Sequence, residues 1–220
     1  MQQGIASISM VGTTGLICIP TAQVIPNGKI AVGMAYTDAE YSRYGPDYSQ
    51  IAYYATIGYL PFLEASLRVT EFPNLGRLNY HSQKDRMVSV KLRVIDESHY
   101  IPSLVLGIHD IFGNRSIIYN AQYFVISKMI KFPLIGSMRI HTGYSPNPIK
   151  SNKIKSYSMK GAFAGIEKEL SKYLTVILEY DTQKYNAGLK IAPLGDRVNI
   201  DIVLLGFDRI SGGMNVSFDL

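Results

Sequence analysis

The chain has 220 residues, of which 47% are hydrophobic and 18% are charged, and its formal net charge is +5. This length suits one hydrophobic core or one closed barrel, and the single cysteine excludes a disulfide framework and a cysteine-rich metal site. The basic residues are mixed with acidic ones along the chain, which argues against a nucleic-acid-binding face. Tyrosine (16) and glycine (19) are frequent and tryptophan is absent, a mixture that favours strands over helices.

The first 28 residues precede any regular alternation. Met1 leads directly into Gly4 without the basic start and apolar block of a secretory signal peptide, so we expect a mature form of an exported protein. No run approaches the roughly 20 apolar residues of a membrane helix.

From residue 29 onward, apolar and polar residues alternate with a period of two, which predicts strands rather than helices. In 63–71, for example, Leu63 and Leu67 share one face and Glu64 and Arg68 the other. Regular strands are expected at 29–37, 63–71, 86–94, 136–144, 174–182 and 212–220. Less regular strands are expected at about 49–60, 103–111, 116–127, 160–168, 185–192 and 197–206. The total is about twelve.

The polar faces of these strands carry full charges in mid-strand. A water-filled or charge-paired lumen accommodates such groups while the apolar faces meet lipid, although a soluble sandwich could expose them on its outer face. The lumen-lining candidates are Glu64, Arg68, Lys91, Arg93, Arg139, His141, Glu179, Asp181 and Lys190. We expect some of them to pair, with Glu64–Arg68 and Glu179–Lys190 as candidates.

The lengths of the connections alternate. Long polar loops are expected at 38–48, 72–85 and 145–159, all on one side, and short turns on the other, with 128–135 as a longish, apolar exception. Outer-membrane barrels show this asymmetry. The sequence therefore predicts an all-β fold, a transmembrane antiparallel up-and-down barrel of about twelve strands in the bacterial outer membrane.

The barrel is expected to span residues 29–220, preceded by a periplasmic or plug segment at 1–28. A barrel of about twelve strands is narrow enough to be blocked by an inserted segment. We therefore expect that 4–27 either plugs the lumen or adds a strand.

No catalytic or cofactor site is evident. His141 lies near Ser137 and Ser145 in the sequence, but no nucleophile signature accompanies it, and no closely spaced set of metal ligands occurs. Gly12 and Gly15 lack the Lys-Ser/Thr ending of a phosphate-binding loop. We expect no enzymatic activity, no metal and no cofactor.

Two segments resemble YjbH/GfcD-type outer-membrane exopolysaccharide biosynthesis proteins. The first is GTTGLICIPTAQVIPNG (12–28) with the following strand, and the second is GAFAGIEKEL (161–170) with LTVILEYDTQKYNAGLKIAP (174–193). The matching positions are Gly12, Gly15, Pro20, Thr21, Ala22, Gly165, Glu167, Glu179, Tyr180, Asp181, Tyr185 and Gly188. The chain is identified as a short, single-barrel member of that family.

The resemblance implies a role in exporting or assembling extracellular polysaccharide, as a conduit or as an anchor for periplasmic partners. A general small-solute porin and a structural or adhesive outer-membrane protein remain the alternatives. The expected partners are outer-membrane lipid, polysaccharide and periplasmic secretion proteins, and no nucleic acid.

Overall fold

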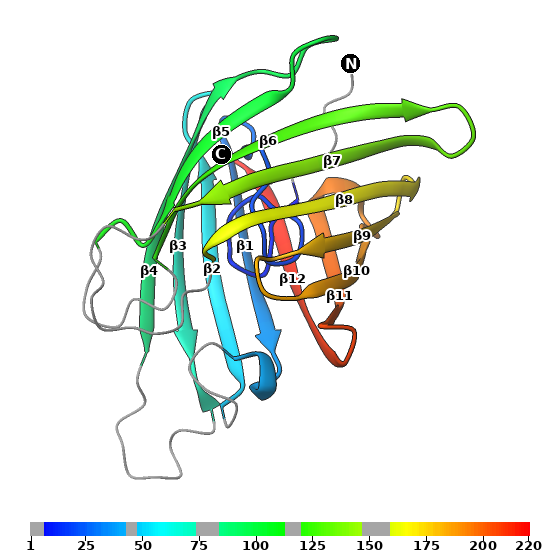
Figure 1. The fold of residues 1–220 in the computed structure, drawn as a ribbon. Coiled ribbons are helices and arrows are strands. Elements are labelled where there is room, and N and C mark those ends of the chain that lie inside the picture. The colour runs from blue at the N-terminus through cyan, green and yellow to red at the C-terminus, as the bar shows by residue number, and fades with distance from the viewer. Residues whose placement is uncertain (1–6, 43–47, 74–83, 113–119, 147–158) are drawn as a thin grey trace.

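The computed structural model describes residues 7–42, 48–73, 84–112, 120–146 and 159–220. Twelve strands form one closed antiparallel barrel in which each strand pairs with its neighbours in sequence and β1 pairs with β12 (Figure 1). The predicted all-β fold with about twelve antiparallel strands is confirmed. None of the helices among the described residues is long and apolar enough to cross a membrane.

The strands are β1 (Lys29–Thr37), β2 (Gln50–Gly58), β3 (Leu63–Glu71), β4 (Asp85–Ile95), β5 (Ser103–His109), β6 (Ala121–Phe132), β7 (Gly136–Ser145), β8 (Gly161–Ser171), β9 (Leu174–Tyr180), β10 (Tyr185–Ile191), β11 (Val198–Leu205) and β12 (Arg209–Asp219). Two short 3-10 helices, η1 (Ala39–Tyr41) and η3 (Gly195–Arg197), lie in the connections.

The connection predicted at 128–135 is wrong. The strand expected to end at 127 continues to Phe132, and β7 begins at Gly136, directly opposite it in the register. The stretch from Lys128 to Phe132 continues the ladder with the residues from Gly136 to Ile140 of β7, and strand geometry places Ile130 and Phe132 on the opposite face from Lys131. This apolar stretch is therefore the end of a long hairpin and not a loop, and the hairpin projects beyond the neighbouring strands in Figure 1.

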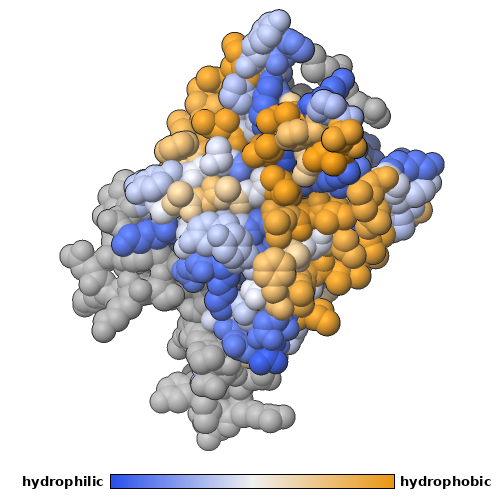
Figure 2. Space-filling view, turned by 45° about the vertical axis from the view of Figure 1, so that its right-hand side comes forward, coloured by the Kyte–Doolittle hydropathy of each residue, from blue (hydrophilic) through white to orange (hydrophobic). Residues whose placement is uncertain are grey.

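The polarity of the sheet is inverted relative to that of a soluble protein, because the inner face is polar and the outer face is apolar. In β3, Glu64, Ser66 and Arg68 are buried, whereas Leu67 between them is 50% exposed. The same pattern recurs around the barrel, and Figure 2 shows the resulting apolar area on the outer surface. Burying charge and exposing hydrocarbon is unfavourable for a sheet in water, so the outer face requires an apolar surrounding or a partner.

The two ends of the barrel differ. Lys29 of β1 lies opposite Asp219 of β12, and this end, here called the terminal end, also holds the connections 59–62, 96–102, 133–135, 172–173 and 192–197. The opposite end, the loop end, holds the connections expected to be long, at 38–48, 72–85 and 145–159. Parts of these, including the basic stretch around Lys150, Lys153 and Lys155, lie outside the described residues.

Residues 7–28 are here called the plug. Residues 7–25 lie inside the barrel, where Figure 1 shows the blue coil enclosed by the strands, and residues 26–28 lead to β1 at the terminal end. The plug folds back on itself through isolated bridges that join Ile8 to Thr14 and Gly15 to Pro20. Eight of the twenty buried residues of the hydrophobic cluster in the described part of the chain belong to the plug, and among them Leu16, Ile17 and Ile19 are almost fully enclosed. The core of this barrel is thus built jointly by the plug and by the barrel wall.

Candidate functional site

Glu64 of β3 holds the plug at two points. Its carboxylate accepts hydrogen bonds from the Thr14 backbone N–H (2.9 Å), the Thr14 hydroxyl (2.8 Å) and the Ile25 backbone N–H (2.9 Å). These donors belong to an irregular segment that has no ladder to satisfy them. A buried acceptor from the wall therefore replaces the partners that a strand would provide.

Lys91 of β4 lies directly opposite Glu64 in the register and is fully buried. Its Nζ lies 3.9 Å from Glu64 Oε1 and donates to the backbone carbonyls of Thr14 (2.7 Å) and Gln23 (2.8 Å). The ammonium and the carboxylate together satisfy donors of Thr14 and Ile25 and acceptors of Thr14 and Gln23. Removing water from such a pair is costly unless every polar atom finds a partner, and here the plug supplies those partners.

Glu179 of β9 forms a second carboxylate anchor. Its oxygens accept from the backbone N–H groups of Ile17 (2.9 Å), Cys18 (2.8 Å) and Ile19 (3.4 Å), and from the Asn186 side chain (3.1 Å). Consecutive N–H groups that converge on one anion form a nest. The turn at 17–19 is therefore fixed to the barrel wall by a single side chain.

Lys190 of β10 complements this anchor from the next strand. It donates to the Ser7 hydroxyl, to the Ile8 carbonyl (3.3 Å) and to the Gly15 carbonyl (3.0 Å). The partners of these charges differ from our expectation. Glu64 lies across from Lys91 rather than pairing with Arg68, and Glu179 and Lys190 each bind plug backbone. The inserted segment offers nearer polar groups than the same-face neighbours do.

His141 of β7 belongs to a row of polar side chains on the wall. Its Nδ1 lies 2.7 Å from the Ser127 hydroxyl, whose oxygen accepts from the Ala22 backbone N–H (2.8 Å), and its Nε2 lies 3.4 Å from Glu167 Oε1. The serine beside His141 is thus Ser127, on the neighbouring strand β6, rather than Ser137 or Ser145. Ser127 contacts the plug, so this row also supports the inserted segment.

The remaining lumen candidates lie at different depths. Arg68 and Asp181 are buried, Arg139 is 8% exposed and bonds to Glu97 (2.7 Å), and Arg93 lies at the terminal end with Asp96 (2.7 Å). Ligand atoms of Cys18, Glu179 and Asp181 lie within 4.8 Å of one another, a proximity that sequence spacing could not reveal. The carboxylate of Glu179 is already engaged by the plug N–H groups.

Several glycines at the resemblance positions leave room for the plug. A Cβ on Gly165 would lie 2.4 Å from Leu16 Cδ1, and one on Gly188 would lie 3.0 Å from Ile17 Cδ1. Gly12, at φ +91°, turns the plug against Tyr54 of β2 and offers its carbonyl to Thr56 (2.5 Å). Tyr185, by contrast, is 61% exposed on the outer face.

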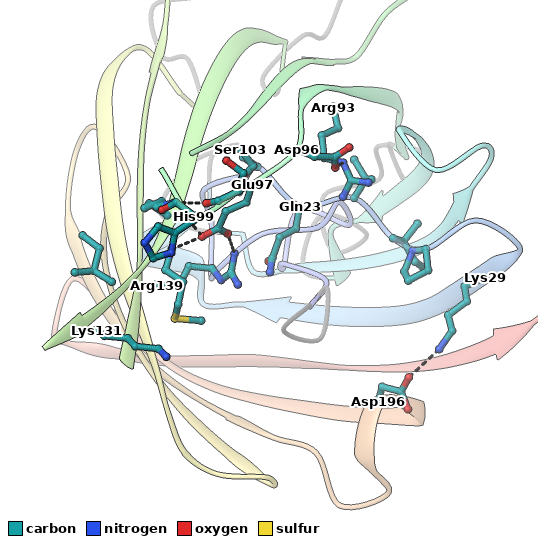
Figure 3. A pocket seen from close by; sticks show the side chains of 18 of the residues that line it. Gln23, Lys29, Arg93, Asp96, Glu97, His99, Ser103, Lys131, Arg139 and Asp196 are labelled. Carbon is teal, nitrogen blue, oxygen red and sulfur yellow. Dashed lines mark hydrogen bonds and ion pairs between the residues drawn. The ribbon is translucent and has the colours of Figure 1, made fainter. Parts of the chain in front are cut away.

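A cavity of about 860 Å³ opens at the terminal end of the barrel (Figure 3). The plug residues 22–26 form one side of it, and the end of the β6–β7 hairpin and the connection 96–102 contribute others. Its charged lining residues are Lys29, Arg93, Lys128, Lys131, Arg139, Asp96, Glu97 and Asp196. The volume is within the range of small-molecule sites.

Glu97 organises the cavity wall. It comes from the connection 96–102 and accepts from Arg139 and from the Met129 backbone N–H (2.8 Å), with Lys128 Nζ 3.9 Å away. Lys128 also donates to the carbonyls of that connection. Sequence reading missed Glu97, because its position in a turn gives no strand alternation to mark it as inward-facing.

Comparisons with known proteins agree on one family. The family model described as "Exopolysaccharide biosynthesis protein YbjH" (YjbH) matches residues 7–202. A protein of Escherichia coli (strain K12) described as "Uncharacterized lipoprotein YjbH" is 30% identical over 123 residues, which cover 53% of this chain and 16% of that protein. The family match includes the plug, the ten strands from β1 to β10 and the first part of β11. The chain therefore belongs to the YjbH family of exopolysaccharide biosynthesis proteins.

Proposed function

We propose that the chain is an outer-membrane β-barrel that assists the export or assembly of extracellular polysaccharide and acts while the plug occupies its lumen. The observation that carries the proposal is the combination of the family with a barrel whose polarity is inverted. The family supplies the polysaccharide context. The apolar outer face of the barrel is the reason for proposing a membrane location.

The exposed apolar outer face supports a lipid environment. Every strand presents large apolar side chains outward, and the buried charged groups of Glu64, Lys91, Glu179 and Lys190 face the plug. In a bilayer, a closed barrel satisfies all its backbone hydrogen bonds between strands, so it has no unpaired edge. Outer-membrane lipid is accordingly the partner that we propose for this face.

The plug favours an assisting role over that of a general porin. Glu64, Lys91, Glu179 and Lys190 all bind backbone groups of the plug, so the wall charges that would line an aqueous pore are engaged. A free solute path requires these buried bonds to break. We therefore propose that the chain serves as a scaffold for periplasmic secretion partners and performs no reaction of its own.

Deletion of the gene tests the cellular role. Loss of surface polysaccharide, restored by the wild-type gene, is the expected result, and unchanged polysaccharide would overturn the proposal. Purified protein that stays monomeric in water without detergent would overturn the membrane part.

A disulfide that fixes the plug in the lumen distinguishes the scaffold role from a conduit role. The Ala22 backbone lies 2.8 Å from the Ser127 side chain, so Ala22→Cys with Ser127→Cys, in a Cys18→Ser background, places two thiols close together. The oxidised double variant is expected to restore polysaccharide as well as either single variant does. If only the oxidised double variant fails to restore surface polysaccharide, and reductant restores it, then the plug must move and the scaffold role is refuted.

A further inference from the structure

The cavity at the terminal end is bounded by the plug itself. Ala22, Val24 and Pro26 line it, with Met129 and Ile130 from the β6–β7 hairpin. Apolar side chains therefore cover part of the wall, and polar groups of Gln23 and Ser103 interrupt them. A ligand that alternates C–H faces with hydroxyl groups matches such a lining.

The cavity is lined by more basic than acidic side chains. Five basic side chains line it against three carboxylates. Four of the five lie within 4.0 Å of a carboxylate oxygen: Lys29 with Asp196, Arg93 with Asp96, and Lys128 and Arg139 with Glu97.

Lys131 is the exception. Among the described parts of the chain, no carboxylate lies within ion-pair distance of its ammonium, and Figure 3 shows the side chain directed toward the cavity. The cavity thus presents one cation that no carboxylate of the described residues neutralises. Such a group attracts an anionic ligand and adds specificity more than affinity.

Glu97 shows what kind of group this wall accepts. Its carboxylate is held by a guanidinium, a backbone N–H and a nearby ammonium. This combination of donors is typical of carboxylate recognition. Lys131 lies two residues from Met129 on the same strand, and so extends the same basic wall toward the open end.

We infer that this cavity binds a segment of acidic polysaccharide whose sugars carry carboxylates, with Lys131 as a contact for one carboxylate. The inference rests on the proposed function, because that function brings a polysaccharide to this end of the barrel. An acidic peptide would satisfy the cations equally, but the family context favours a sugar. A carboxylated sugar uses both the cations and the mixed apolar and hydroxyl-binding wall.

Isothermal titration of the full chain in a nonionic detergent tests the inference. The probes are tetragalacturonate, the neutral tetrasaccharide maltotetraose and the peptide tetraglutamate. The test variant is Lys131→Glu, and the matched control is Lys172→Glu, which reverses an exposed lysine in the β8–β9 turn at the same end but outside the cavity. Far-UV circular dichroism and heat-modifiable gel mobility check that both variants fold.

The expected result is saturable binding of tetragalacturonate that weakens about fivefold in Lys131→Glu, since an exposed charge contact contributes up to about 1 kcal/mol. Lys172→Glu should bind as the wild type does, and the other two probes should bind at least tenfold more weakly. Absence of saturable binding, equal binding of maltotetraose, or equal loss in both variants would overturn the inference. Equal binding of tetraglutamate would assign the cavity to acidic peptides instead. None of these outcomes changes the deletion phenotype, so the two proposals fail separately.

Discussion

Replacing Glu179 by alanine should release the plug without unfolding the barrel. The carboxylate accepts two short hydrogen bonds from plug backbone, from Ile17 (2.9 Å) and Cys18 (2.8 Å), and a longer one from Ile19 (3.4 Å). The barrel ladder does not depend on these bonds, because β9 pairs with β8 and β10 through its own backbone.

The size of the effect follows from the donors that lose their partner. Each buried N–H left without an acceptor costs about 1–3 kcal/mol, so the two short bonds set the range at about 2–6 kcal/mol. Water that enters the vacated space lowers the cost, so we take about 3 kcal/mol. That value raises the population of the released plug by about a hundredfold.

A buried cysteine in the plug measures this population. Ser9 is 1% exposed, and Ser9→Cys is nearly isosteric; with Cys18→Ser it leaves a single thiol that reacts with a maleimide only when the plug opens. Labelling should be about a hundredfold faster with Glu179→Ala, and planar bilayers should show new conductance events. The control is Glu169→Ala, at an exposed position of β8.

Equal labelling rates and silent bilayers in Glu179→Ala and Glu169→Ala would refute this reasoning. Such a result would mean that the apolar packing of Leu16, Ile17 and Ile19 alone holds the plug. Loss of the heat-modifiable barrel band in Glu179→Ala would contradict the reasoning differently, because it would show that plug and barrel unfold as one unit.

Three further outcomes are expected. Lys91→Met leaves the buried Glu64 without its cation and should destabilise the protein by about 3 kcal/mol or more. The double variant Glu64→Gln with Lys91→Met should lose less stability than the sum of the two single variants, as measured by thermal melting in detergent. Gly58→Ala places a Cβ 2.1 Å from the Pro26 carbonyl oxygen, whereas the nearest atoms to a Cβ in Gly165→Ala belong to side chains, with Leu16 Cδ1 at 2.4 Å and Glu179 Cβ and Ile19 Cδ1 at 3.1 Å. Gly58→Ala should therefore lower the melting temperature more, and the reverse order would contradict the backbone clash. The hydrogen bond from Lys29 lowers the pKa of Asp196, so this pair stabilises the protein above the ordinary aspartate pKa and that stability is lost as pH falls through the lowered value. Asp196→Asn should remove that acid-side loss, by less than about 1 kcal/mol because both groups are partly exposed, and identical acid-side melting of the two proteins would exclude the contribution.

The barrel could be read from the sequence because a period-two pattern is a local property. Each strand that spans a sheet with one polar and one apolar face must alternate, and 29–37 and 63–71 coincide with β1 and β3. The pattern failed at 128–135, where a run richer in apolar residues continues the hairpin instead of ending it. Alternation predicts the position of a strand more reliably than the residue at which the strand ends.

Only the tertiary structure shows which groups the inward-facing charged side chains bind. The sequence identified Glu64, Lys91, Glu179 and Lys190 as inward-facing candidates, because they interrupt apolar strands. Their partners include backbone groups of residues 8–25, up to 182 positions away, and only barrel closure brings the plug and these strands together. Charges predicted to pair with one another instead hold an irregular segment, since its unpaired N–H and C=O groups are the polar atoms that most need partners once they are buried.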